Sequence, residues 1–218
     1  MTQPLTLLSL PLFPLGTVLH PGGNLPLRIF EVRYLDMVRK CQRSGAPFGV
    51  VLLTQGSEVN KARAPDAAGA APSETFHPIG TLATIAECTT PQAGLMMVRC
   101  TGTHRFQVTR SEKLKHGLWI ADVTLLPDDQ TVAIPPDLAH VAQALNALIQ
   151  SLHQRAVPAP EMPVQAPYLL DDCAWVANRW CELLPIPAEH KQRLMELDNP
   201  LLRLELVSDV LEGAGISG

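Results

Sequence analysis

The sequence has few charged and few aromatic residues, and it has no surplus of positive charge. Of its 218 residues 17% are charged and 5% are aromatic, and 17 Lys and Arg stand against 21 Asp and Glu. Proteins that neutralise many phosphates normally carry a basic surface, and single-stranded nucleic acids are usually bound on aromatic platforms. The composition therefore argues against a nucleic-acid partner.

Paired cysteines of the CxxC type are missing, and so is any long hydrophobic run. The five cysteines are odd in number, which fits reduced thiols better than a secreted disulfide framework. The N-terminal apolar stretch lacks the basic start of a signal peptide and is interrupted by Pro4, Pro11 and Pro14. No later stretch reaches the ~20 apolar residues that span a bilayer. We expect a cytoplasmic protein without a membrane partner.

Motifs for nucleotide hydrolysis, metal binding and covalent catalysis are also missing. The chain has no Gly-Lys step of a P-loop, no HExxH and no GxSxG. Ser111 and Lys113 could form a Ser-Lys pair, but their charged surroundings are typical of a solvated loop. Cys88, Cys100 and His104 match none of the common zinc spacings. We expect no enzymatic activity, no structural metal and no cofactor.

Near Pro135 and Pro136 the period of the hydrophobic residues changes from that of strands to that of helices. Before this point, short apolar runs between Gly, Pro, Asn and Ser clusters predict strands at 5–10, 25–29, 48–53, 79–87, 95–101, 103–110 and 118–126. One helix, beginning near Phe30 and stopped by Gly45, interrupts them. After it, the helical period predicts helices near 138–152, 171–184, 187–197 and 200–212. We expect an α+β protein with a β-rich domain over 1–130 and a helical subdomain over 136–215.

The densest motif runs from Leu10 to Tyr34 and reads LPLFPLGTVLHPGGNLPLRIFEVRY. Its prolines and glycines indicate turns around short apolar strands. Arg28, Glu31 and Arg33 bracket the expected start of the first helix, where a carboxylate interacts favourably with the helix N-terminus and with a neighbouring arginine. These three charges predict a local network that fixes how strand meets helix, and direct contact with a ligand is the alternative.

This block resembles the opening of the N-terminal, substrate-binding domain of the Lon protease family, which reads like LPLFPL, then PG, then LPLRIFE and RY. The resemblance continues through PFGVVLL at 47–53, IGTLATI at 79–85, GTHRFQV at 102–108 and PIPAEHKQRLMELDNPLLRLELVSDVL at 185–211. It implies a PUA-like β-barrel with one interrupting helix, followed by a four-helix region. It also implies a free-standing domain, because the ATPase and protease domains of Lon do not fit in this length. Arg105, within GTHRFQV, joins Arg28, Glu31 and Arg33 as a motif residue of structural role.

The resemblance implies a non-enzymatic module that binds exposed apolar segments of unfolded polypeptides in protein quality control. A protease or a chaperone is a further partner that this role suggests. Aromatic and methionine side chains adapt to varied partners. The candidate binding residues, each also compatible with an ordinary core position, are Leu25, Leu27, Phe30, Tyr34, Met96, Met97 and Phe106.

Two other classes of function stay open. The alternative hypothesis is a nucleic-acid-binding PUA-like module, motivated by Arg39, Lys40 and Arg43 at the end of the first helix. A small hydrolase using His20, Glu31 and His104 is the third hypothesis, for which the sequence names no nucleophile.

Overall fold

The computed structural model describes residues 5–56 and 74–215, and the chain divides into two compact units. The first unit comprises Met1–Pro21 and Leu25–Pro127, and the second comprises Gly22–Asn24 and Asp128–Gly218. Helices and strands together make a mixed α+β fold, as the sequence predicts. Within the described residues, no helix is both long and apolar enough to cross a membrane.

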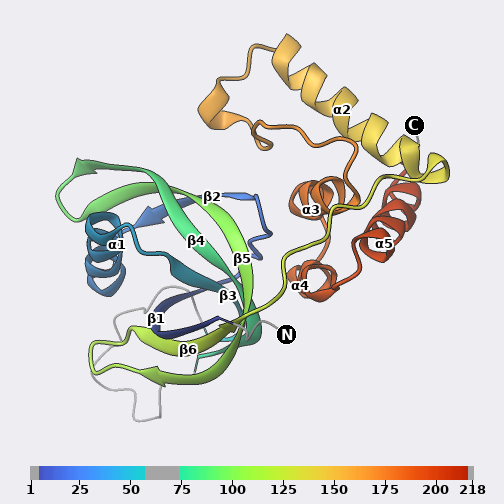
Figure 1. Ribbon diagram of the computed structural model, residues 1–218. Coiled ribbons are helices and arrows are strands. Elements are labelled where there is room, and N and C mark those ends of the chain that lie inside the picture. The colour runs from blue at the N-terminus through green and yellow to red at the C-terminus, as the bar shows by residue number, and fades with distance from the viewer. Residues whose placement is uncertain (1–4, 57–73, 216–218) are drawn as a thin grey trace. The chain divides into compact units, whose positions relative to one another are not determined.

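The first unit is built on a sheet that has six strands in the described residues (Figure 1): β1 (Thr6–Leu15), β2 (Asn24–Ile29), β3 (Phe48–Gln55), β4 (Thr75–Gln92), β5 (Leu95–Lys113) and β6 (Trp119–Leu125). Pairings run from β5 through β4, β3, β1 and β6, and β6 pairs with β5 again. β1 and β3 pair in parallel, and the other four strand pairs in this series are antiparallel. β2 stands at the end of the strand order, next to β5.

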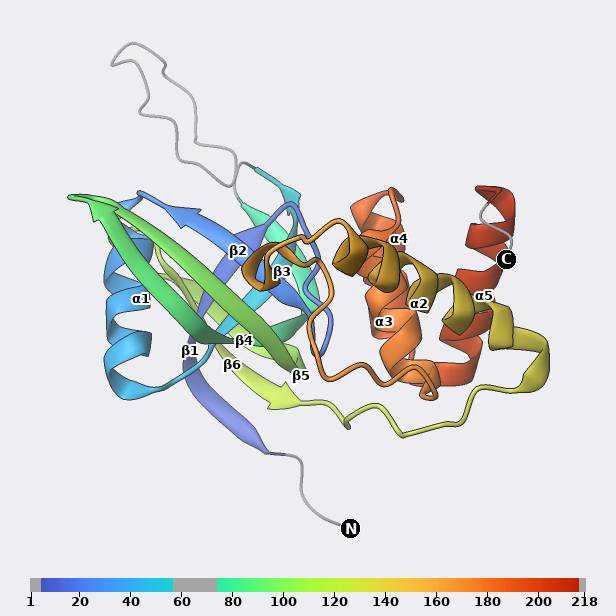
Figure 2. The same ribbon diagram turned by 90° about the horizontal axis from the view of Figure 1, so that it is seen from above.

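The predicted interrupting helix is α1 (Val32–Ser44), and it lies beside the turn end of the long β4–β5 hairpin (Figures 1 and 2). Its buried face includes Tyr34, Met37, Val38 and Cys41, the stripe expected from helical spacing. The helix ends where Gly45 adopts φ 67°, a left-handed conformation that glycine adopts without steric cost.

Two of the predicted strands are wrong as separate elements, because 95–101 and 103–110 both belong to β5. The register between β4 and β5 shifts between the pairs Thr81–Arg105 and Ala83–Gly102, so the glycine marks an irregularity within a strand and not a turn. A Cβ on Gly102 would lie 2.3 Å from the carbonyl oxygen of His20. Glycine is therefore required here by the close approach of another backbone segment.

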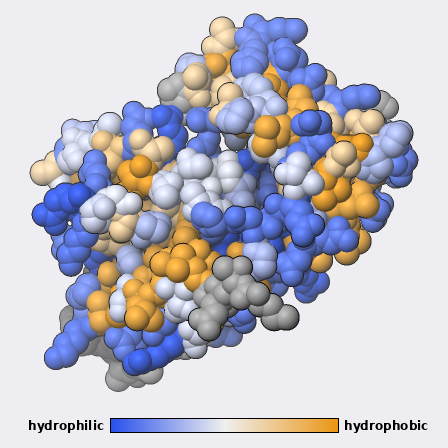
Figure 3. Space-filling model, in the orientation of Figure 1, coloured by the Kyte–Doolittle hydropathy of each residue, from blue (hydrophilic) through white to orange (hydrophobic). Residues whose placement is uncertain are grey.

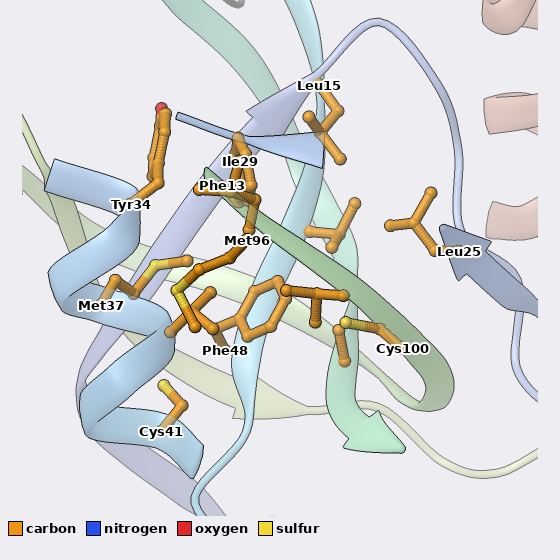
Figure 4. Close-up of a cluster of buried hydrophobic side chains, with 14 of the residues drawn as sticks. Phe13, Leu15, Leu25, Ile29, Tyr34, Met37, Cys41, Phe48, Met96 and Cys100 are labelled. Atoms are coloured by element: carbon orange, nitrogen blue, oxygen red, sulfur yellow. The ribbon is translucent and has the colours of Figure 1, made fainter. Parts of the chain in front are cut away.

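Two apolar clusters fill the first unit. The larger joins α1 to β1, β2, β3 and β5, and Figure 4 shows Met37 and Cys41 from the helix facing Phe48 and Met96. The smaller contains Leu12, Val51, Phe106 and Val123, which are all almost completely buried. The described residues of the first unit thus form two apolar clusters that share no residues.

The second unit is helical, with η1 (Pro136–Leu138), α2 (Ala139–Gln154), η2 (Ala159–Glu161), α3 (Cys173–Leu183), α4 (Ala188–Glu196) and α5 (Pro200–Gly213). The four α-helices correspond to the four predicted ones. Asn199 caps α5, since its side-chain oxygen accepts hydrogen bonds from the backbone N–H groups of Leu201 and Leu202. α2 and α3 are joined by the indole N–H of Trp180, which donates to the carbonyl of Val141 at 3.0 Å.

Candidate functional site

An open groove in the first unit lies where β1, β2 and the start of α1 meet. It has a volume of about 280 Å³. β1 contributes Phe13 and Leu15, β2 contributes its residues from Leu25 onwards, and Tyr34 comes from α1. Most of the lining side chains are apolar, so the groove suits an apolar ligand.

Two stacked aromatic rings line the groove. The rings of Phe13 and Tyr34 stack with their centroids 3.9 Å apart and their planes 21° apart. Both side chains are almost fully buried, and in Figure 4 the hydroxyl of Tyr34 points away from the apolar cluster. Phe30 differs from them because 51% of its surface is exposed. The groove therefore combines one half-exposed aromatic ring with two buried, stacked rings.

Two charged side chains, Arg28 and Glu31, line the groove, and a third, Arg33, binds one of them. The Glu31 carboxylate accepts a hydrogen bond from Nε of the buried Arg33 at 3.1 Å. Arg33 also donates to the carbonyl of Gly117 at 2.7 Å, and its guanidinium lies 4.4 Å from the centroid of the Tyr34 ring. Arg33 and Glu31 thus hold the loop before α1 in place, while Arg28 is exposed to solvent.

Behind this network lies the buried carboxylate of Glu74. It accepts hydrogen bonds from Nζ of Lys113 and Nε1 of Trp119, both at 2.8 Å, and Nη1 of Arg33 lies 3.7 Å away. Burial alone would raise the pKa of Glu74, but these hydrogen bonds and the charges of Lys113 and Arg33 outweigh it and lower the pKa below its ordinary value. The carboxylate is therefore ionised at neutral pH and ties β5 and β6 to the start of α1.

The structure brings four of the seven predicted apolar residues together. Leu25, Leu27, Phe30 and Tyr34 all line the groove. Met96 is buried in the larger core cluster, and 44% of Met97 is exposed. Phe106 is completely buried in the smaller cluster and does not line the groove. Neither Met96 nor Met97 lines it either.

Of the motif charges, Glu31 and Arg33 form the expected pair, whereas Arg28 has no ion pair with another described residue. Arg105 is buried and donates to the carbonyl of Pro127 at 3.3 Å. Sequence reasoning did not select Phe13, Leu15 and Ile29, which also line the groove. The signal that could have found them is their place in the same dense motif from Leu10 to Tyr34.

The other candidate sites do not gain support. Lys113, the base of the supposed Ser-Lys pair, is bound to the Glu74 carboxylate. His20 is completely buried, so it offers a substrate no acid-base group. Cys100 is buried, and this burial, together with Cys88 and Cys41, raises its pKa to about 12. Among the described residues no cluster of His, Cys, Asp and Glu could hold a metal ion.

The basic end of α1 is partly neutralised within the helix itself. Nη1 of Arg39 lies 3.2 Å from a carboxylate oxygen of Asp36 in an exposed pair, and Nε of Arg43 donates to the carbonyl of Arg39. Arg43 lies in the last turn of the helix, where positive charge complements the helix dipole.

Comparison with known proteins places these features in a family. A crystal structure of a Lon N-terminal domain protein from Xanthomonas campestris is similar at 32% identity and TM-score 0.69, covering 93% of this chain and 98% of that one. The N-terminal domain of Lon protease from the Mycobacterium avium complex shares the fold, at 16% identity and TM-score 0.56, over 92% of this chain and 96% of that one. Among curated proteins, none is significantly similar. The model of the ATP-dependent protease La (LON) substrate-binding domain matches residues 9–213, and the chain therefore belongs to this family of non-catalytic, substrate-binding domains.

Proposed function

We propose that this protein binds exposed apolar segments of unfolded polypeptides in the groove formed by β1, β2 and the start of α1, as a step in protein quality control. The observation that carries the proposal is the open apolar groove, which is lined by the half-exposed ring of Phe30 and by the stacked rings of Phe13 and Tyr34. Membership of a substrate-binding family supports a polypeptide as the ligand. The PUA-like barrel that the resemblance implies is part of the same proposal, and the return of the strand pairings to β5 supports it.

The size of the groove sets the expected strength of binding. Burial of apolar surface stabilises a complex by about 25 cal/mol per Å², and the ordering of an unfolded segment opposes it. Contact over a few hundred square ångströms contributes roughly 5 to 12 kcal/mol before this cost, so we expect micromolar or weaker affinity for many sequences. Because the driving force is apolar, this affinity depends little on salt.

A nucleic-acid-binding module would behave differently. Affinity for phosphates falls steeply between low and moderate salt, because counterions are released on binding. A titration of an unfolded model protein and of a structured RNA at two ionic strengths separates the two functions. We expect the unfolded protein to bind at both ionic strengths. RNA binding with a steep salt slope, and no affinity for unfolded protein, would overturn the proposal.

A matched pair of variants locates the binding surface. Phe30→Ser removes the half-exposed ring of the groove, and Leu206→Ser removes an apolar side chain on α5 that is 38% exposed. We expect Phe30→Ser to weaken binding of the unfolded protein about tenfold, which corresponds to about 1.4 kcal/mol. Leu206→Ser should leave the affinity unchanged. Equal affinities of the two variants would show that this groove is not the binding site.

A further inference from the structure

Two strand edges at the groove have no strand partner among the described residues. β1 pairs with β6 from Thr6 to Leu12 and with β3 from Leu12 to Leu15, so the edge of Phe13–Leu15 opposite β3 is unpaired. β2 pairs with β5 and stands at the end of the strand order, so its other edge is unpaired as well. Residues of both strands line the groove.

The sequences of these two edges fit this arrangement. Pro14 in β1 and Pro26 in β2 have no backbone N–H, and proline within a sheet is tolerated where a strand edge is unpaired. The remaining N–H and C=O groups of an unpaired edge can pair with an added strand, a common mode of peptide recognition. An extended segment is therefore the conformation that the groove is suited to receive.

The charges of the groove indicate what such a segment carries. Glu31 and Arg28 are the charged residues among its lining side chains. The Glu31 carboxylate is already engaged by Arg33, whereas no ion pair joins Arg28 to another described residue. Within the part of the chain that the structure describes, Arg28 is thus a positive charge without a carboxylate partner beside apolar lining residues, and an acidic side chain complements it.

We propose that the groove receives an extended polypeptide segment, added along the free edges of β1 and β2, in which apolar residues are accompanied by a carboxylate that pairs with Arg28. This inference rests on the proposed function and specifies its substrate class. The apolar side chains fill the groove over Phe13 and Tyr34, and the acidic residue makes a solvent-accessible ion pair.

The test uses three labelled peptides of about eleven residues with alternating valine and threonine, which carry Asp, Asn or Lys at the same central position. Exposed ion pairs contribute little, so we expect the Asp peptide to bind about two- to fivefold more tightly than the Asn peptide at low salt. The difference should shrink at high salt, while binding of the Asn peptide persists. Methylation of alternate backbone nitrogens should weaken binding of the Asp peptide further, because it removes the N–H groups of one edge.

Charge reversal makes the test specific. Arg28→Glu should invert the preference, so that the Lys peptide binds more tightly than the Asp peptide. Arg110→Glu is the matched control, since Arg110 is exposed on β5 and does not line the groove, and it should keep the wild-type preference.

The outcomes separate this inference from the proposed function. If all three peptides bind equally, or backbone methylation has no effect, while Phe30→Ser still weakens binding of unfolded protein, the inference falls and the proposed function stands. If unfolded protein binds and no peptide does, the inference falls as well. If neither binds, both are overturned.

Discussion

Glu74 is a buried carboxylate on which donors from distant parts of the chain converge. Lys113 and Trp119 donate hydrogen bonds to it from β5 and β6, and Arg33 approaches it from α1. A buried charge of this kind is stabilised only while its partners are present. The start of α1, which borders the groove, therefore depends on one acidic residue that lies outside the recognisable motif.

We expect Glu74→Gln to lower the free energy of unfolding by about 2 to 3 kcal/mol at neutral pH, because charged hydrogen bonds are lost and three donors lose their anion. The pKa of Glu74 is lowered in the folded protein, so its contribution is present at neutral pH and is lost as the pH falls below the ordinary value of 4.5. The difference in stability between wild type and variant should accordingly shrink in acid.

Urea unfolding between neutral and acid pH measures this difference. Glu112→Gln is the control, because Glu112 pairs with Arg110 where both side chains are more than half exposed. It should change stability by less than about 0.5 kcal/mol at every pH. A pH-independent effect of Glu74→Gln would contradict the prediction.

Gly102 is a second position where one residue decides the local structure. A methyl group there would meet the backbone of His20 at 2.3 Å and the side chain of Leu19 at 3.0 Å. We expect Gly102→Ala to destabilise the protein by about 1 to 3 kcal/mol, the usual cost of overpacking a close contact. Thermal unfolding measures the loss.

The control for this substitution is Gly213→Ala. Gly213 is the last residue of α5 and has open space around its Cα, so an added methyl group meets no other atom. Alanine also has the higher helix propensity. Stability should stay the same or rise slightly, and an equal loss in both variants would show that the close contact at Gly102 is not the cause.

At the scale of elements, Arg203 of α5 connects the helices of the second unit. Its side chain is completely buried and binds both carboxylate oxygens of Asp129, at 2.7 and 2.9 Å. It also donates to Asn178 of α3 and to the carbonyls of Leu194 and Leu197 at the end of α4. The planar guanidinium, with its five donors, suits this number of acceptors.

We expect Arg203→Met to destabilise the helical unit by about 3 to 5 kcal/mol, because Asp129 and several carbonyls are then left without their partner in a buried place. Arg193→Met is the matched control on the exposed surface of α4, and it should have an effect below about 0.5 kcal/mol. Circular dichroism during denaturant unfolding reports both values. Equal effects would show that the hydrogen bonds of Arg203 do not stabilise the helical unit.

At the scale of the whole molecule, the cysteines report on the two units separately. Cys100 lies in the core of the first unit and Cys181 in that of the second, and these cores share no residues. Burial is the main reason that the pKa of each thiol is raised, in both cases to about 12. Both therefore stay protonated and unreactive unless their unit opens.

Burial also raises the pKa of the half-buried Cys88, but its partial exposure admits reagent, so at pH 8 we expect a thiol reagent to label Cys88 faster than the four buried cysteines. Cys88→Ser should remove the fast phase. Mass spectrometry of the labelled sites should show that Gly102→Ala speeds labelling of Cys100 and leaves Cys181 unchanged. Equal acceleration at both sites would mean that the two units open together.

The sequence by itself determined the fold class, the family and most element positions. The change from strand to helix period, the stop of α1 at Gly45 and the cap of α5 at Asn199 are local features, and local propensity and capping decide them. The sequence also indicated part of the groove, because Leu25, Leu27, Phe30 and Tyr34 lie close together along the chain in one dense motif.

Only the tertiary structure decided the rest, because it depends on residues far apart in sequence. Among the described residues, strand pairing leaves one edge of β1 and one edge of β2 without a strand partner, and no local sequence pattern shows which edges these are. Gly102 falls between two predicted strands, but in the structure it lies within β5 in close contact with His20, which is 82 positions earlier. Phe106 looks like a binding residue, yet strand pairing buries it. Periodicity gives the side of an element that is buried, whereas the packing of distant elements decides which apolar side chains remain open to a ligand.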